Sequence, residues 1–149
     1  MKSSSRLRSQ ATRTEEHLDV VIVDDDERYR MTMCRGIEAA GYLAGGAKDA
    51  LTACSLIPLD RPGLAVIDTD IAGKDALWLA SRFTSLNPHL QVVFTAGDPD
   101  SLKLIKQSSL PSLGLLLKPL DHTDILAILQ TVAFKRPCDT YPALMSNHA

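Results

Sequence analysis

Residues 18–27 read Leu-Asp-Val-Val-Ile-Val-Asp-Asp-Asp-Glu, a run of apolar residues that ends abruptly in four acids. The four apolar residues before the acids are all β-branched, which favours a strand, and their unbroken run is typical of a strand buried on both faces. A helical pattern follows, with Tyr29, Met33 and Ile37 on one face and Gly41 just past its end. The stretch therefore predicts a buried strand, an acidic turn and a helix.

The alternation of strand and helix continues to residue 134. Further strands are predicted at residues 42–47, 64–67, 90–94 and 113–117, and further helices at 48–57, 74–85, 99–109 and from 121 onward. Strands that alternate with helices predict a parallel sheet with helices on both faces. We therefore expect one α/β domain over residues 18–134, with a doubly wound five-stranded parallel sheet and five helices.

Length and composition exclude several classes of protein. The chain has 149 residues, 45% of them hydrophobic and 23% charged, which fits one globular domain. No apolar stretch approaches the roughly 20 residues that span a bilayer, and residues 1–13 lack the apolar centre of a secretory signal. A net charge of −2 gives no reason to expect binding to nucleic acid or to a membrane. We expect a cytoplasmic protein with a disordered basic tail at 1–17 and a second tail at 135–149.

The acidic residues are unevenly distributed. Residues 1–13 carry +4, which leaves −6 for the rest of the chain, and the acids comprise 14 Asp and 4 Glu. Aspartate is favoured in turns and at the ends of strands rather than on helix faces. This bias predicts an acidic centre among the loops.

Polar side chains follow four of the five predicted strands. They are Asp24, Asp25 and Asp26, then Asp68 and Asp70, then Thr95, and finally Lys118. The carboxyl ends of parallel strands lie at one end of the sheet, where sites form in this class of fold. Close carboxylates repel one another and favour a divalent cation, and hard oxygen ligands select Mg²⁺. A lysine and a hydroxyl nearby would hold a phosphoryl group, with one carboxylate as its nucleophile.

Four stretches at these strand ends resemble the receiver domain of two-component response regulators. They are VVIVDDDERYR at 20–30, LAVIDTDIAGKDAL at 64–77, VVFTA at 92–96 and LLLKPLD at 115–121. Order and spacing also match the family, with 44 residues from Asp24 to Asp68, 27 more to Thr95 and 23 more to Lys118. The resemblance covers residues 18–134 and implies a flavodoxin-like sheet of strand order 2-1-3-4-5.

The resemblance implies a role for three of these residues in phosphoryl transfer. Asp68 would accept a phosphoryl group from a histidine kinase or a histidine phosphotransfer protein. Thr95 would contact a phosphoryl oxygen, and Lys118 would form an ion pair with the group. The protein would then be a signalling domain and not an enzyme, since its own phosphorylation and dephosphorylation are the only reactions expected of it.

The resemblance also implies the ligands of a Mg²⁺ ion. Asp25 and Asp68 would bind it directly, Asp24 largely through water, and Asp70 through its backbone carbonyl. Asp26 is expected to cap the following helix and not to bind the metal. The family also implies a cis peptide bond between Lys118 and the proline after it, an isomer that proline alone makes accessible at low cost.

Two departures from the family pattern leave other functions open. Leu115 stands where the family usually has Tyr or Phe, and Ala72 where it usually has Pro. These departures would suit a phosphorylation-independent adaptor with the receiver fold. Residues 67–73, IDTDIAG, also resemble the signature of haloacid-dehalogenase-like phosphatases. In those enzymes a further acidic motif follows the lysine, whereas in this chain the acidic run precedes Asp68, so the order of motifs disfavours this alternative. The favoured hypothesis is a stand-alone receiver that signals to an unidentified protein target by contact. A homodimer is compatible with it.

Overall fold

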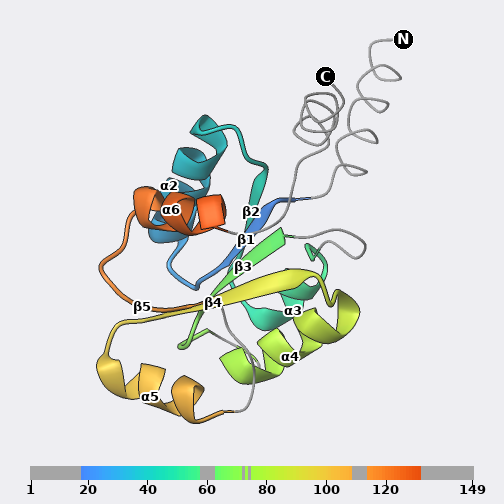
Figure 1. The fold of residues 1–149 in the computed structure, drawn as a ribbon, viewed down its shortest axis with the longest axis vertical. Helices are drawn as coiled ribbons and strands as arrows, with labels where there is room; N and C mark the ends of the chain where they lie inside the picture. The colour runs from blue at the N-terminus through green and yellow to red at the C-terminus, as the bar shows by residue number, and fades with distance from the viewer. Residues whose placement is uncertain (1–17, 58–62, 72, 74, 109–113, 132–149) are drawn as a thin grey trace, which may run out of the picture.

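The computed structural model describes residues 18–57, 63–71, 73, 75–108 and 114–131. The two predicted tails, residues 132–134 of the predicted domain and Ala72 lie outside these ranges. Within the described residues, five strands alternate with five helices (Figure 1). In chain order the elements are β1 Val20–Val23, α2 Glu27–Ala39, β2 Ala44–Ala47, α3 Ala50–Cys54, β3 Gly63–Asp68, α4 Ala76–Leu86, β4 Leu90–Ala96, α5 Pro99–Gln107, β5 Gly114–Leu117 and α6 His122–Thr131.

The five strands form one sheet in the order β2-β1-β3-β4-β5, and every neighbouring pair is parallel. This confirms the predicted fold and strand order. The register pairs Val23 with Ala47 on one side and with Ile67 on the other, and it pairs Asp68 with Thr95. Four strands from distant parts of the sequence therefore end at the same end of the sheet, which we call the carboxyl end.

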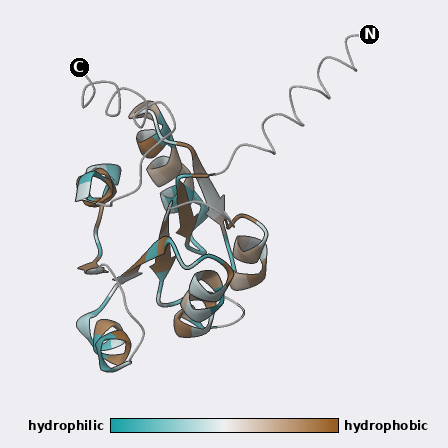
Figure 2. Ribbon diagram, turned by 45° about the vertical axis from the view of Figure 1, so that its right-hand side comes forward, coloured by the Kyte–Doolittle hydropathy of each residue, from teal (hydrophilic) through white to brown (hydrophobic). Residues whose placement is uncertain are grey.

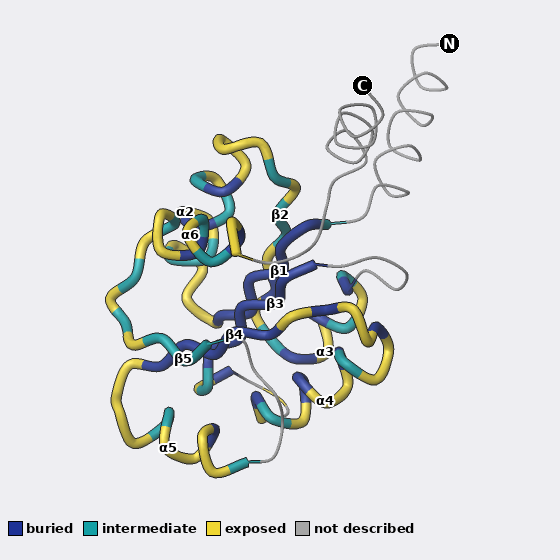
Figure 3. The backbone as a smooth tube through the Cα atoms, in the orientation of Figure 1, coloured by how far each residue is buried: buried dark blue, intermediate teal, exposed yellow. Residues whose placement is uncertain are grey.

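Helices cover both faces of the sheet (Figure 1). Helices α2 and α6 pack on one face around Ile37 and Ile125, and α3, α4 and α5 pack on the other around Phe83. All four residues of β1 are buried because its alternate side chains enter the two apolar clusters in turn. Figure 2 shows apolar strands between helices of mixed polarity, and Figure 3 shows the buried strands at the centre.

The start of α6 lies directly against α2 at Gly36. A Cβ atom at this position would overlap the imidazole of His122, so the hydrogen of glycine leaves the space that the ring occupies. The close approach holds the start of α6, which follows the turn after β5, against the last turn of α2. Lys118 lies in this turn and the acidic residues lie before α2, so both parts of the site adjoin helices that pack on one another.

Aspartate residues cap the helices of this fold. The carboxylates of Asp26, Asp49, Asp75 and Asp98 each accept a hydrogen bond from the backbone N–H three residues later, at the starts of α2, α3, α4 and α5. The carboxylate of Asp121 accepts the N–H of Thr123 at the start of α6. The capping role predicted for Asp26 is confirmed, and much of the excess of aspartate in the sequence serves helix initiation.

Replacing Asp75 with alanine is expected to lower the free energy of unfolding by about 1 kcal/mol, the usual cost of losing an N-cap. The reason is that the N–H of Trp78, 2.7 Å from the Asp75 carboxylate, loses its acceptor. Urea denaturation followed by circular dichroism measures the change. Asp75→Asn keeps an acceptor and is the matched control. Equal losses in the two variants would show that the cap does not account for the effect.

Strand β2 and helix α3 are clearly shorter than the sequence predicts. Strand β2 begins at Ala44 and not at residue 42, because the N–H of Leu43 donates to the carboxylate of Asp19 (2.8 Å) instead of entering the sheet. Helix α3 ends at Cys54, where the backbone N–H of Ser55 turns to the carbonyl of Thr52 (3.2 Å). In the part of the chain that the structure describes, no helix is long and apolar enough to cross a membrane.

Candidate functional site

Backbone hydrogen bonds continue the sheet beyond the ends of the strands. The N–H of Thr69 donates to the carbonyl of Thr95 (2.9 Å), and the N–H of Lys118 donates to the carbonyl of Ala96 (2.8 Å). The residues that follow β3 and β5 are therefore both bound to β4 by a backbone hydrogen bond. This pairing places Asp68 and Lys118 at the carboxyl end of the sheet, although 50 residues separate them in the chain.

Lys118 joins two buried carboxylates. Its Nζ lies 2.6 Å from Oδ2 of Asp24 and 3.1 Å from Oδ2 of Asp68. Asp24 is 1% exposed and Asp68 4% exposed, so neither carboxylate is solvated as it would be on the surface. A buried charge is stable in a protein only when it is paired, and here one ammonium group serves two carboxylates.

The other oxygen of each carboxylate is held by the backbone of its own loop. Oδ1 of Asp24 accepts the N–H of Asp26 (2.9 Å), and Oδ1 of Asp68 accepts the N–H of Asp70 (3.2 Å). The two loops therefore curl in the same way around the two carboxylates. Each carboxylate is fixed by a local backbone contact on one oxygen and by Lys118 on the other.

Burial and neighbouring charges shift the protonation of the site. Burial, and secondarily the charge of Asp24, raise the pKa of Asp68, while the N–H of Asp70 and the Lys118 ammonium act in the opposite direction. Burial also acts to lower the pKa of Lys118, but the hydrogen bond and charge of Asp24 and of Asp68 outweigh it, so the pKa of Lys118 is raised. Lys118 is consequently an ammonium group at neutral pH.

Asp24, Asp25 and Asp68 form a cluster whose donor set fits a divalent cation. One carboxylate oxygen from each residue lies within 4.8 Å of the other two. Asp25 is exposed, whereas the other two carboxylates are buried, so an ion could enter the cluster from solvent on the side of Asp25. Three carboxylates face one ammonium group, and hard oxygen donors with residual negative charge are what Mg²⁺ prefers.

Thr95 and Asp70 lie beside this cluster. Thr95 is 1% exposed and is paired with Asp68 in the register of β3 and β4. Paired residues of neighbouring strands point to the same face of the sheet, so the side chain of Thr95 is adjacent to that of Asp68. Asp70 follows Asp68 in the same loop, and its side chain is exposed to solvent.

Two residues of α2 join the site although the sequence did not predict a role for them there. The ring of Tyr29 lies against Lys118, with Nζ 4.6 Å from the ring centroid. Nη1 of Arg30 donates to the backbone carbonyl of Asp24 (2.8 Å). Both residues fall in the first turn after the acidic run, and helical periodicity assigned Tyr29 only to the core. Proximity to the acidic run along the chain was the only available signal.

The peptide bond between Lys118 and Pro119 is cis, as the family resemblance implied. The sequence model of one protein family, the response regulator receiver domain, matches residues 20–130 of the chain. The chain belongs to this family. The matched range includes all the site residues described above.

Several curated proteins are similar to this receiver domain in sequence. Sporulation initiation phosphotransferase F of Bacillus subtilis is 24% identical over 106 residues, which is 71% of this chain and 86% of that protein. The DNA-binding transcriptional regulator NtrC of Rhizobium meliloti is 26% identical over 110 residues, which is 74% of this chain but 23% of that protein. The similarity to the second relative therefore concerns only one part of a longer protein.

Solved structures show the same fold. A CheY-like response regulator receiver domain protein from Methanospirillum hungatei superposes with a TM-score of 0.67 at 19% identity, covering 78% of this chain and 93% of that one. A response regulator protein from Burkholderia pseudomallei, with a phosphorylated aspartic acid and a calcium ion, gives a TM-score of 0.63 at 24% identity, covering 75% and 66%. At these identities the likeness concerns the fold.

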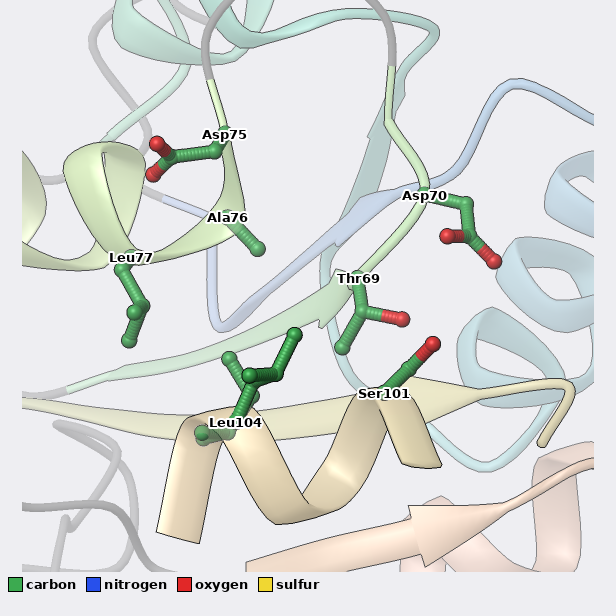
Figure 4. A pocket seen from close by; sticks show the side chains of 8 residues that line it. Thr69, Asp70, Asp75, Ala76, Leu77, Ser101 and Leu104 are labelled. Carbon is green, nitrogen blue, oxygen red and sulfur yellow. The ribbon is translucent and has the colours of Figure 1, made fainter. Parts of the chain in front are cut away.

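A cavity of about 370 Å³ opens beside the receiver site, between the start of α4 and α5 (Figure 4). Apolar side chains such as Leu77 and Leu104 form one part of its lining, and the hydroxyl groups of Thr69 and Ser101 lie at another. Figure 4 shows the carboxylate of Asp75 turned away from these hydroxyl groups. The three carboxylates of the acidic cluster do not line the cavity, although Thr69 and Asp70, which follow Asp68 in the chain, do.

Leu115 lies in β5, on the far side of β4 from Asp68. Its side chain is half-buried and packs against the apolar cluster formed by α3, α4 and α5. An aliphatic side chain thus takes the place where the family has an aromatic ring. The other departure from the family pattern, Ala72, falls outside the described residues.

Proposed function

We propose that this receiver domain is a phosphorylation switch whose acceptor is Asp68. The phosphoryl donor would be a histidine kinase or a histidine phosphotransfer protein, and Mg²⁺ would be required. The phosphorylated domain would then act on a downstream protein by direct contact. The observation that carries the proposal is the convergence of Asp68, Asp24 and Lys118 within hydrogen-bonding distance at the carboxyl end of the sheet.

The arrangement suits a carboxylate that attacks phosphorus. An oxygen of Asp68 would form the new P–O bond, while the bond from phosphorus to the donor breaks and its electron pair leaves with the donor group. Negative charge is spread over the phosphoryl oxygens during transfer, and Lys118 and Thr95 are placed to stabilise it. No further reactant is needed, because the donor supplies the phosphoryl group and keeps the leaving electron pair.

Asp24, Asp25 and Asp68 are the side chains that would hold Mg²⁺, together with the backbone carbonyl of Asp70. Bound Mg²⁺ would neutralise charge on the carboxylates and on the incoming phosphoryl group. The response regulator protein from Burkholderia pseudomallei, which has a similar fold, carries a phosphorylated aspartic acid and a calcium ion, and this supports the proposal.

Phosphorylation can be tested with a small donor. Incubation of the protein with acetyl phosphate and Mg²⁺ is expected to add the mass of one phosphoryl group, detected by intact-protein mass spectrometry. Asp68→Asn should stay unmodified, whereas Asp100→Asn, which alters an exposed acid on α5, should be modified as the wild type is. An unmodified wild type would contradict the proposal and would favour a phosphorylation-independent adaptor.

Mg²⁺ is expected to stabilise the folded protein. A concentration ten times the dissociation constant adds about 1.4 kcal/mol to the free energy of unfolding, which corresponds to a rise in Tm of about 5 °C for a domain of this size. Asp25→Asn should abolish most of this rise without unfolding the protein, because Asp25 is exposed. Differential scanning fluorimetry measures both, with KCl at equal ionic strength as the control. A rise that survives in Asp25→Asn would place the ion elsewhere.

A further inference from the structure

Tyr29 contacts Lys118 with its ring, in addition to packing against the apolar cluster of α2 and α6. Lys118 Nζ lies 4.6 Å from the centroid of the Tyr29 ring, within the range of a cation–π interaction. The same ammonium group donates to Asp24 and Asp68. Since an ammonium group has three N–H donors, two carboxylates leave one side of the charge to be covered, and the aromatic ring lies against the ammonium group.

The hydroxyl group of Tyr29 does not explain why the residue is there. It is buried and has no hydrogen-bond partner among the described residues, which is an unfavourable state for a polar group. Burial is the main reason why its pKa rises to about 12, so the hydroxyl is neutral at any ordinary pH. Tyr29 contacts the site through the face of its ring, which lies against Lys118 Nζ.

A lysine side chain needs such a contact because its stem is long and flexible. Four rotatable carbons allow the ammonium group to leave the site for water, where it is strongly hydrated. When a phosphoryl group arrives on Asp68, Lys118 must exchange a carboxylate oxygen for a phosphoryl oxygen. The ring can hold the ammonium group during this exchange, since its attraction does not depend on which anion lies opposite.

We propose that Tyr29 is a positioning residue for phosphoryl transfer, and that the face of its ring holds the Lys118 ammonium group over Asp68. The proposal rests on the proposed function, because it concerns the rate at which Asp68 is phosphorylated. It assigns no contact between Tyr29 and the phosphoryl group. Tyr29 acts through Lys118, and its effect therefore exists only when Lys118 is present.

The experiment compares rates of phosphorylation by acetyl phosphate in the presence of Mg²⁺, followed by intact-protein mass spectrometry. Tyr29→Leu removes the ring and is expected to lower the rate about tenfold, in line with the strength of a partly desolvated cation–π contact. Tyr29→Phe keeps the ring and should restore the rate to within about twofold of the wild type. Pentafluorophenylalanine at position 29 keeps the shape but reverses the charge distribution of the ring, and should behave as Leu does.

Two controls separate positioning from packing. Tyr42 packs against the same apolar cluster as Tyr29 but precedes β2, at the opposite end of the sheet from the site. Tyr42→Leu therefore removes a comparable ring without touching Lys118 and should leave the rate unchanged. In a Lys118→Met background, Tyr29→Leu should cause no further loss, whereas a structural defect would lower the rate again.

Each outcome distinguishes the proposals. If the wild type is phosphorylated and Tyr29→Leu is as fast, the positioning role is wrong while the phosphorylation switch stands. If Tyr29→Phe is as slow as Tyr29→Leu, the hydroxyl group and not the ring face matters, which also overturns the inference. If Tyr29→Leu does not fold, the fluorinated ring decides, since it preserves the packing. An unphosphorylated wild type would overturn the proposed function itself.

Discussion

Lys118→Met is expected to accept phosphoryl groups on the order of 100 times more slowly than the wild type, the usual cost of losing one preorganised charge-stabilising group. Methionine has a similar length and no charge, so it removes the ammonium group that lies 2.6 Å from Asp24 and 3.1 Å from Asp68. Charge that develops on the phosphoryl oxygens would then lack its cation. Time courses with acetyl phosphate and Mg²⁺, read by mass spectrometry, measure the loss.

The Mg²⁺ affinity of Lys118→Met shows why its phosphorylation is slower. The cause is either weaker stabilisation of the phosphoryl group or weaker binding of the metal ion. Without Lys118, the carboxylates of Asp24 and Asp68 lose a competing cation, so Mg²⁺ should bind at least as tightly as in the wild type. Lys103→Met, which removes an exposed lysine from α5, is the matched control and should behave as the wild type does. Weaker Mg²⁺ binding in Lys118→Met would contradict the charge arrangement described here.

Phe83→Ala is expected to lower the free energy of unfolding by about 3–5 kcal/mol, a large part of the stability of a single domain. Phe83 is 0% exposed and lies on α4 in the apolar cluster between the sheet and helices α3, α4 and α5. Alanine leaves a cavity that the surrounding strands cannot fill, because they are held in the sheet by backbone hydrogen bonds. Urea denaturation monitored by circular dichroism measures the change.

A second position on α4 provides the control for Phe83. Leu86 is 37% exposed at the end of the same helix, so Leu86→Ala removes an apolar side chain that is much less buried. Its expected cost is below about 1 kcal/mol. Similar losses for the two variants would mean that helix stability, and not the packing of Phe83 against the sheet, determines the result.

The positions of the site residues could be predicted from the sequence because they depend on local patterns. Asp24 follows a run of β-branched residues. Asp68 comes directly after a second apolar run, and Lys118 directly after a third. Once the runs are recognised as parallel strands, the geometry of such sheets brings their carboxyl ends together. The capping role of Asp26 could also be predicted from the sequence, because it depends on a backbone N–H only three residues away.

The sequence explained only part of the excess of aspartate. The sequence favoured an acidic centre, and the structure does gather Asp24, Asp25 and Asp68 into one cluster. The same bias also provides N-caps at helices far from the site, such as Asp49 and Asp98. Composition alone does not distinguish the two uses, because a carboxylate that caps a helix and one that binds a metal contribute equally to the count.

The sequence by itself determined the alternation of strand and helix, the acidic and basic residues at the strand ends, and through them the family. Only the tertiary structure decided how these groups meet. Lys118 reaches an aspartate 94 residues away, and the Tyr29 ring lies against the same ammonium group. Such contacts depend on how α2 and α6 pack across the sheet, with Gly36 allowing their close approach. Hydrophobic periodicity specifies which face of a helix is buried, but the partner of each side chain is selected by packing between distant segments.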